Sequence, residues 1–135
     1  MPHPLPPLTE PQLALVSRIW DRGEATVAEL VGDLAAAGRP LARNTVQTTV
    51  QRLEEKGWLR HREQRGVFIY QVTRERAAAQ AEMAGRLVDG AFAGRIDALV
   101  QTLVRGRGLD AATLARLRTL IDETPPAVPT AEAQP

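Results

Sequence analysis

The side chains best suited to chemistry lie in a polar run over residues 43–51, where amides, hydroxyls and guanidinium groups predominate. Asn and Gln can form paired hydrogen bonds with adenine, Arg can do so with guanine, and Thr offers a hydroxyl or a methyl group. A merely solvated helix surface is more often built from Lys and Glu. The run therefore predicts contacts with the base edges of double-stranded DNA, made by Arg43, Asn44, Thr45, Gln47 and Thr48, with Gln51 exposed beside them.

A set of cations follows this run and is better suited to phosphates than to base edges. Residues 39–76 hold nine basic and four acidic residues, a net charge of +5, although the whole chain carries only +1. Positive charge concentrated in one segment is typical of polyanion binding. Pairing with Glu54, Glu55 or another surface acid is the alternative for Arg52 and Lys56. The predicted phosphate contacts are Arg52, Lys56, Arg60, Arg62 and Arg65.

Catalytic and metal-binding constellations are missing from the sequence. The chain has no cysteine, which removes disulfides, thiolate metal sites and cysteine nucleophiles, and its only histidines are His3 and His61. Acidic residues are scattered, and no glycine-rich phosphate loop follows a strand. The sequence therefore predicts a protein that is not an enzyme and that binds no cofactor and no metal.

Three helices are predicted ahead of the glycine at position 57. Capping boxes at Thr9–Gln12 and Thr26–Glu29 start the first two helices, which are expected to end near residues 21 and 37. The third helix, over 43–56, lacks a capping side chain at its start. A short turn containing Gly38 joins the second and third helices. This is the layout of a helix-turn-helix, whose second helix enters the major groove of DNA.

A β-hairpin is predicted after the third helix. Residues 58–59 and 67–72 are rich in β-branched and aromatic side chains, and the short connection over 63–66 ends in a glycine that tolerates a positive φ. The hairpin would be the wing of a winged helix-turn-helix. Trp20 and Trp58 are expected to pack in the core of this domain rather than to stack on bases.

A long helical stretch with an apolar stripe follows Thr73, its predicted cap. Three glycines between residues 85 and 94 each weaken the stretch by about 1 kcal/mol, which predicts a kink or a break. Asp110 is expected to cap a last helix. The apolar stripe exceeds what one winged domain needs, so a second copy of the chain is expected to cover it, and folding back onto its own domain is the alternative. The predicted dimer interface comprises Leu87, Val88, Phe92, Ile96, Leu99, Val100, Leu103, Leu117 and Leu120.

The predicted fold class is mostly α-helical with a small β-hairpin wing: a winged helix-turn-helix domain followed by a helical dimerisation region. The expected parts are a flexible arm at 1–8, the winged domain at 9–73, the dimerisation helices at 74–123 and a disordered tail at 124–135. No apolar run reaches the roughly 18 residues that span a bilayer, and Met1–Pro7 lacks the features of a signal peptide. A cytoplasmic protein without membrane insertion is expected.

The sequence resembles the BlaI/MecI family of penicillinase repressors over about residues 8–123. The resemblance is carried by LTEPQLALVSRIW at 8–20, NTVQTTVQRLEEKGWL at 44–59 and FIY at 68–70. It implies a homodimeric repressor whose winged domain binds a dyad operator and whose C-terminal helices interlock with those of the partner. In the family, bases are read at the positions held here by Asn44, Thr45, Gln47 and Thr48, and phosphate is gripped at the position of Arg52.

The resemblance also implies a partner and a signal. Family members typically silence β-lactamase or related genes, and a membrane sensor metallopeptidase commonly triggers their inactivation by cleavage in the dimerisation region. The best-known members are cleaved within an Asn-Phe pair, whereas the matching place in this chain is Thr102-Leu103. The copper-responsive branch of the family uses a C-terminal cysteine cluster, which this chain lacks.

Two other functions fit the same sequence. One is a small-molecule-responsive winged-helix regulator with a pocket between the winged domain and the dimer helices. The other is a winged-helix protein-interaction module without DNA binding, because a fold alone does not decide a function. The polar first half of the helix over 43–56 argues against the second alternative, because protein-binding faces are usually more apolar.

Overall fold

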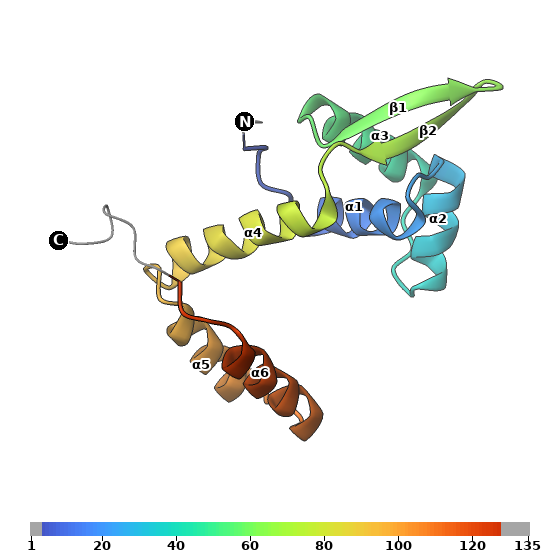
Figure 1. The fold of residues 1–135 in the computed structure, drawn as a ribbon. Helices are drawn as coiled ribbons and strands as arrows, with labels where there is room; N and C mark the ends of the chain where they lie inside the picture. The colour runs from blue at the N-terminus through green and yellow to red at the C-terminus, as the bar shows by residue number, and fades with distance from the viewer. Residues whose placement is uncertain (1–3, 128–135) are drawn as a thin grey trace. The chain divides into compact units, whose positions relative to one another are not determined.

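The computed structural model describes residues 4–127 of the chain (Figure 1). Two compact units divide between Gly85 and Arg86, and each is described by itself. His3 and the part of the predicted tail at 128–135 lie outside the described residues. The structure confirms the predicted fold class, since it is mostly helical and contains one two-stranded antiparallel hairpin.

The first three helices begin where the sequence predicts. α1 covers Glu10–Arg22, α2 covers Val27–Ala36, and both have complete capping boxes. At α1, the Thr9 amide donates to the Gln12 side chain, and at α2 the Glu29 amide donates to the Thr26 hydroxyl. α3 covers Arg43–Glu55 and has no side-chain cap, as its sequence indicates.

The predicted hairpin is present and its turn is tight. β1 covers Leu59–Gln64 and β2 covers Val67–Val72. The two turn residues, Arg65 and Gly66, have φ values of 53° and 78°. Positive φ at both positions is the type I′ pattern, whose twist matches that of the flanking strands. The loop is therefore two residues long, shorter than the connection over 63–66 that the sequence indicates.

A single hydrophobic core holds the first unit together. Trp58 is 3% exposed, which confirms its predicted core position. Trp20 is half-buried, packs against the core and donates its indole N–H to the Arg74 carbonyl at 3.0 Å. The largest fully buried side chains are Leu15, Val16, Ile19, Leu30, Val46, Val50, Leu53 and Tyr70.

The described residues of the N-terminal segment pack against the winged unit. Leu5 and Leu8 are partly buried on its core. The Trp58 indole donates to the Pro6 carbonyl at 2.8 Å, and the Lys56 ammonium donates to the Pro7 carbonyl at 3.0 Å. These contacts fix residues 5–8 beside the junction of α3 and β1.

The helices that follow the hairpin differ from the prediction at their start. α4 covers Arg76–Ala91, so the expectation that Thr73 caps it is wrong. The Thr73 hydroxyl instead donates to the carbonyls of Gly57 and Trp58, at 2.6 and 3.1 Å. These contacts close the base of the hairpin, and α4 begins at Arg76, two residues later than a cap at Thr73 would place its start.

Two further helices complete the described chain. α5 covers Ile96–Gly106, and α6 covers Ala111–Glu123. The predicted break falls at the third glycine, because Ala93 and Gly94 both have positive φ. Asp110 caps α6 as predicted, accepting from the Thr113 amide at 2.7 Å. None of the helices within residues 4–127 combines the length and the apolar character needed to cross a membrane.

Candidate nucleic-acid interface

The polar run predicted to read bases forms the outer face of α3. Val46, Val50 and Leu53 are fully buried on the inner face and anchor the helix to the core. Because buried residues at this spacing turn the intervening side chains outward, the outer face is composed of exposed polar groups. Arg43, Asn44, Thr45, Thr48, Gln51 and Arg52 are exposed, whereas Gln47 is half-buried.

The structure divides the predicted base-reading residues between two sides of α3. Arg43 and Gln47 line an open groove of about 380 Å³ together with the start of α2 and the hairpin residues Val67 and Phe68. Asn44, Thr45, Thr48, Thr49 and Arg52 line a second, shallower groove on the same helix. A ligand that contacts all of these residues must therefore wrap the exposed edge of α3, as the wall of a DNA groove does.

Two of the predicted phosphate contacts have no competing partner. Among residues 4–127, the side chains of Arg52 and Arg65 make no hydrogen bond or ion pair with another described residue, and the same holds for Arg43 of the base-reading set. Arg65 lies at the turn of the hairpin, and Arg52 lies in the last turn of α3. These guanidinium groups are placed to meet an external anion.

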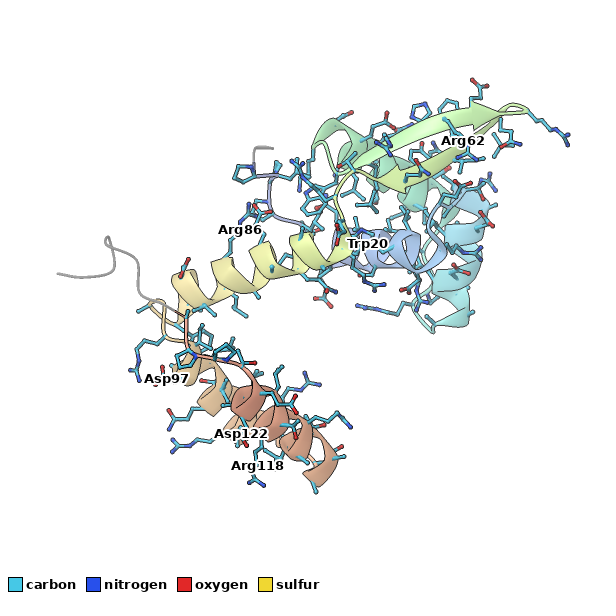
Figure 2. The ribbon with its side chains drawn as sticks, in the orientation of Figure 1. Trp20, Arg62, Arg86, Asp97, Arg118 and Asp122 are labelled. Carbon is cyan, nitrogen blue, oxygen red and sulfur yellow. The ribbon has the colours of Figure 1, made fainter. Side chains whose placement is uncertain are left out.

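The other three predicted phosphate contacts are engaged within the chain. The Lys56 ammonium donates to the Gln12 side chain at 2.9 Å in addition to the Pro7 carbonyl. Arg62, which Figure 2 labels on the hairpin, forms two hydrogen bonds with the Glu24 carboxylate, each of 2.8 Å. Arg60 makes a long contact of 3.4 Å with the Gln71 side chain. Among the described residues, neither Arg52 nor Lys56 pairs with Glu54 or Glu55, which was the alternative expected for these two cations.

An aromatic pair lies on the hairpin and was not predicted. The His61 ring stacks on Phe68 with centroids 4.2 Å apart, and its Nδ1 atom lies 2.7 and 2.9 Å from the two carboxylate oxygens of Glu54. These contacts connect the hairpin to α3. Burial, and secondarily the charge of Glu54, raise the pKa of Tyr70 beside them.

The carboxylate that holds Arg62 was also missed by sequence reasoning. Glu24 lies in the loop between α1 and α2, and the hydrogen bonds from Arg62 hold its pKa below the ordinary value of 4.5. The same bonds raise the pKa of Arg62. Glu24 and Arg62 are 38 positions apart. No local spacing rule connects residues so distant, so only the folded chain reveals the pair.

The second unit exposes much of the predicted dimer interface. Leu87, Ile96, Val100, Leu103 and Leu120 are exposed, with Ile96 at 66% and Leu120 at 62%. Phe92, Leu99 and Leu117 are half-buried, and Val88 is buried. Exposed apolar side chains at this density are typical of a surface that another protein surface covers.

The second unit also contains Thr102 and Leu103, the pair at the position where the best-known members of the family named above are cleaved. Thr102 and Leu103 lie inside α5, and the Thr102 hydroxyl donates to the Ala98 carbonyl at 2.9 Å. Both residues are exposed. Within residues 4–127, no three His, Asp or Glu side chains gather in a way that would hold a metal ion.

Comparison with known proteins places the chain in a family. A family model described as penicillinase repressor matches residues 8–123, which is more than half of the chain. No curated protein matches the chain in sequence. The DNA-binding domain of the repressor BlaI, solved in solution, is 24% identical; the likeness covers 55% of this chain and 89% of that chain, with a TM-score of 0.49.

Two structures of MarR from E. coli extend the likeness along the chain. A mutant form is 22% identical, and the match covers 86% of this chain and 76% of that chain, with a TM-score of 0.52. The oxidised form is 23% identical, with coverage of 86% and 74% and a TM-score of 0.51. At this level of identity the likeness shows a shared fold.

Proposed function

This chain belongs to the penicillinase repressor family, and we propose that it is a transcriptional repressor that binds operator DNA as a homodimer. The observation that carries the proposal is the outer face of α3, where exposed amide, hydroxyl and guanidinium groups stand on a helix anchored by Val46, Val50 and Leu53. The second helix of a helix-turn-helix presents such a face to the major groove.

The roles of the individual side chains follow from their chemistry and their availability. Asn44 and Gln47 are proposed to bind adenine through paired hydrogen bonds, and Arg43 is proposed to bind guanine. Thr45 and Thr48 add hydroxyl or methyl contacts. Arg52 and Arg65 are proposed to bind phosphates, because they have no competing partner among the described residues. A protein bound in this way covers a promoter and excludes RNA polymerase.

A second copy of the chain is the proposed partner of the C-terminal helices. The exposed apolar side chains of α5 and α6 support this, since a two-fold dimer would cover them and would match a dyad operator. Two linked winged units bind two half-sites with an effective concentration that a single unit lacks. Repression would therefore depend on the dimer, and loss of the dimer would relieve it.

Repression is proposed to be relieved through cleavage by a membrane sensor metallopeptidase. The helical conformation of α5 restricts when that cleavage can occur. The matching bond, between Thr102 and Leu103, lies within a helix. Proteases bind their substrates in an extended conformation, so α5 must unwind locally before this bond enters an active site. A protease that acts here would need to bind the unwound state of α5.

The test is an electrophoretic mobility shift with DNA from upstream of the protein's own gene, titrated over salt concentration and in excess random competitor. A saturable shift at nanomolar protein is expected. Gln47→Ala should relax the base preference at one position of each half-site, by about 1–3 kcal/mol of discrimination. Gln80→Ala, a change at an exposed amide of α4, is the matched control and should leave the preference intact.

Any other outcome of the mobility-shift test would contradict one part of the proposal. A shift that random DNA abolishes equally would leave only non-specific binding to the basic segment. No shift at low salt would exclude DNA binding and favour the protein-interaction module. An unchanged base preference in Gln47→Ala would exclude Gln47 as a base reader while leaving repression in place.

A further inference from the structure

The hairpin residue Arg62 has a guanidinium group that is already hydrogen-bonded to the carboxylate of Glu24. Arg62 in β1 directs two nitrogens at the two oxygens of Glu24, and each hydrogen bond is 2.8 Å long. Gln71 donates to the same carboxylate at 3.3 Å. A guanidinium group binds carboxylates and phosphates with the same two-pronged geometry. Glu24 therefore occupies the edge of Arg62 formed by its two terminal nitrogens, which is one of the two edges that could bind a DNA phosphate. Figure 2 labels Arg62 on the hairpin.

The hairpin does not depend on this ion pair for its position. Ala25, the neighbour of Glu24, exchanges two backbone hydrogen bonds with Tyr70, of 3.0 and 2.8 Å. Tyr70 and Leu59 are buried in the core. The side chains of Arg62 and Glu24 are 49% and 41% exposed, and ion pairs at such exposed positions add little to the stability of a fold. The main consequence of the pair is therefore electrostatic.

We propose that Glu24 limits the affinity of this protein for DNA by holding Arg62 away from the phosphate backbone. The inference rests on the proposed function, because it concerns the same interface. A phosphate that displaced Glu24 would leave an unpaired carboxylate beside the negatively charged backbone, which disfavours the exchange. Arg62 thus makes no phosphate contact while Glu24 is ionised, whereas Arg52 and Arg65 are free to do so.

The test is a cycle of four proteins: the unaltered chain, Glu24→Gln, Arg62→Gln and the double variant. Binding to one DNA duplex is measured across salt concentrations. Each phosphate contact adds about 0.9 to the steepness of log K against log salt. Glu24→Gln is expected to steepen the slope by about 0.9 and to tighten binding several-fold at low salt. Arg62→Gln should leave the slope of the unaltered protein unchanged, and the double variant should match Arg62→Gln.

A charge-matched control separates the release of Arg62 from a general loss of negative charge. Asp21→Asn also removes one carboxylate and breaks an ion pair, the 2.7 Å contact with Arg76. It should leave the slope unchanged. Glu24→Ala, measured in parallel, should reproduce the effect of Glu24→Gln. Thermal unfolding checks that every variant is folded before its slope is compared.

The outcomes separate this inference from the proposed function. If the unaltered protein binds DNA and Glu24→Gln has the same slope, Glu24 does not restrain Arg62 and the inference is wrong. A gain that persists in the double variant, or a shallower slope in Arg62→Gln alone, overturns it equally. If none of the four proteins binds DNA at low salt, the proposed function fails and this inference fails with it. Binding by Glu24→Gln alone would support both.

Discussion

The cations of the winged unit differ in whether they have a partner within the chain. The side chains of Arg52 and Arg65 form no hydrogen bond or ion pair with another described residue, whereas Lys56 donates to two neutral oxygens and Arg62 binds a carboxylate. A side chain that is already held must give up those contacts before it binds a phosphate. Net charge therefore overstates the number of cations available to DNA, and substitutions among them should have unequal effects.

Arg52→Ala is expected to weaken binding to all DNA sequences alike. Loss of one phosphate contact should make the slope of log K against log salt shallower by about 0.9. Titrations of specific and random duplexes at several salt concentrations measure this change. Arg18→Ala on α1 removes the same charge from a residue with only a 3.9 Å contact to Asp21, and it should leave the slope unaltered. An equal slope in both variants would exclude a phosphate contact by Arg52.

Asp33 should contribute to stability only above acidic pH. Its pKa is held below the ordinary value of 3.8, first by the hydrogen bond from Arg22. A group whose pKa is lower in the folded state adds stability that is full above 3.8 and is lost as the pH falls through the folded-state value. Melting temperatures measured from neutral to strongly acidic pH should therefore converge between the unaltered protein and Asp33→Asn. A constant gap down to the lowest pH would contradict this linkage.

At the scale of elements, the ends of the helices differ in how well they are capped. α1 and α2 each have a complete capping box, whereas α3, which carries the candidate interface, has Ala42 at its N-cap. Ala42 has φ −63° and ψ 147°, the extended conformation that a capping residue adopts. The start of α3 therefore has the right backbone and lacks only a hydroxyl or carboxylate.

Ala42→Ser should stabilise the winged unit by about 0.5–1 kcal/mol, because the new hydroxyl accepts from an unpaired amide in the first turn of α3. Thr26→Ala is the converse change, and it should cost about 1 kcal/mol by removing the acceptor for the Glu29 amide. Denaturant unfolding measures both. A destabilised Ala42→Ser variant would indicate that a serine at this position bonds elsewhere.

At the scale of the whole molecule, the two units distribute polar and apolar surface differently. The first unit buries its large apolar side chains in one core. The second exposes Ile96, Leu120 and Ile121, each by more than 60%. A unit with this much exposed apolar surface is poorly suited to exist alone in water. This contrast is the physical basis for proposing that the first unit binds DNA and that the second associates with another copy of the chain.

Val100→Asp is expected to convert a dimer into a monomer, because it would place a charge within the apolar face of α5 that a partner copy buries. Sedimentation analysis should show the change in mass, and affinity for a two-half-site duplex should fall further than affinity for a single half-site. Gln101→Asp adds the same charge at the neighbouring exposed position of the polar face and should remain dimeric. An unaltered protein that sediments as a monomer would refute the dimer itself.

The sequence by itself determined the elements whose signals are local. The Thr9 and Thr26 capping boxes act over three residues, and a glycine between two strand-forming runs predicted the hairpin. The two-residue length of its turn came only from the structure. Helical spacing predicted that Val46 and Val50 point inward and thus which face of α3 is exposed. Bonds between near neighbours depend little on the rest of the chain, so these features can be predicted from the residues alone.

Only the tertiary structure decided which cations of the candidate interface are already bonded to another residue of the chain. The Thr73 hydroxyl closes the hairpin rather than capping α4, Lys56 contacts Pro7 across 49 positions, and Glu24 binds Arg62 across 38. The structure likewise divides Gln47 from Asn44 by setting the hairpin beside one edge of α3. Such contacts depend on how packed elements bring distant side chains together. Amino-acid composition and residue spacing do not predict how those elements pack.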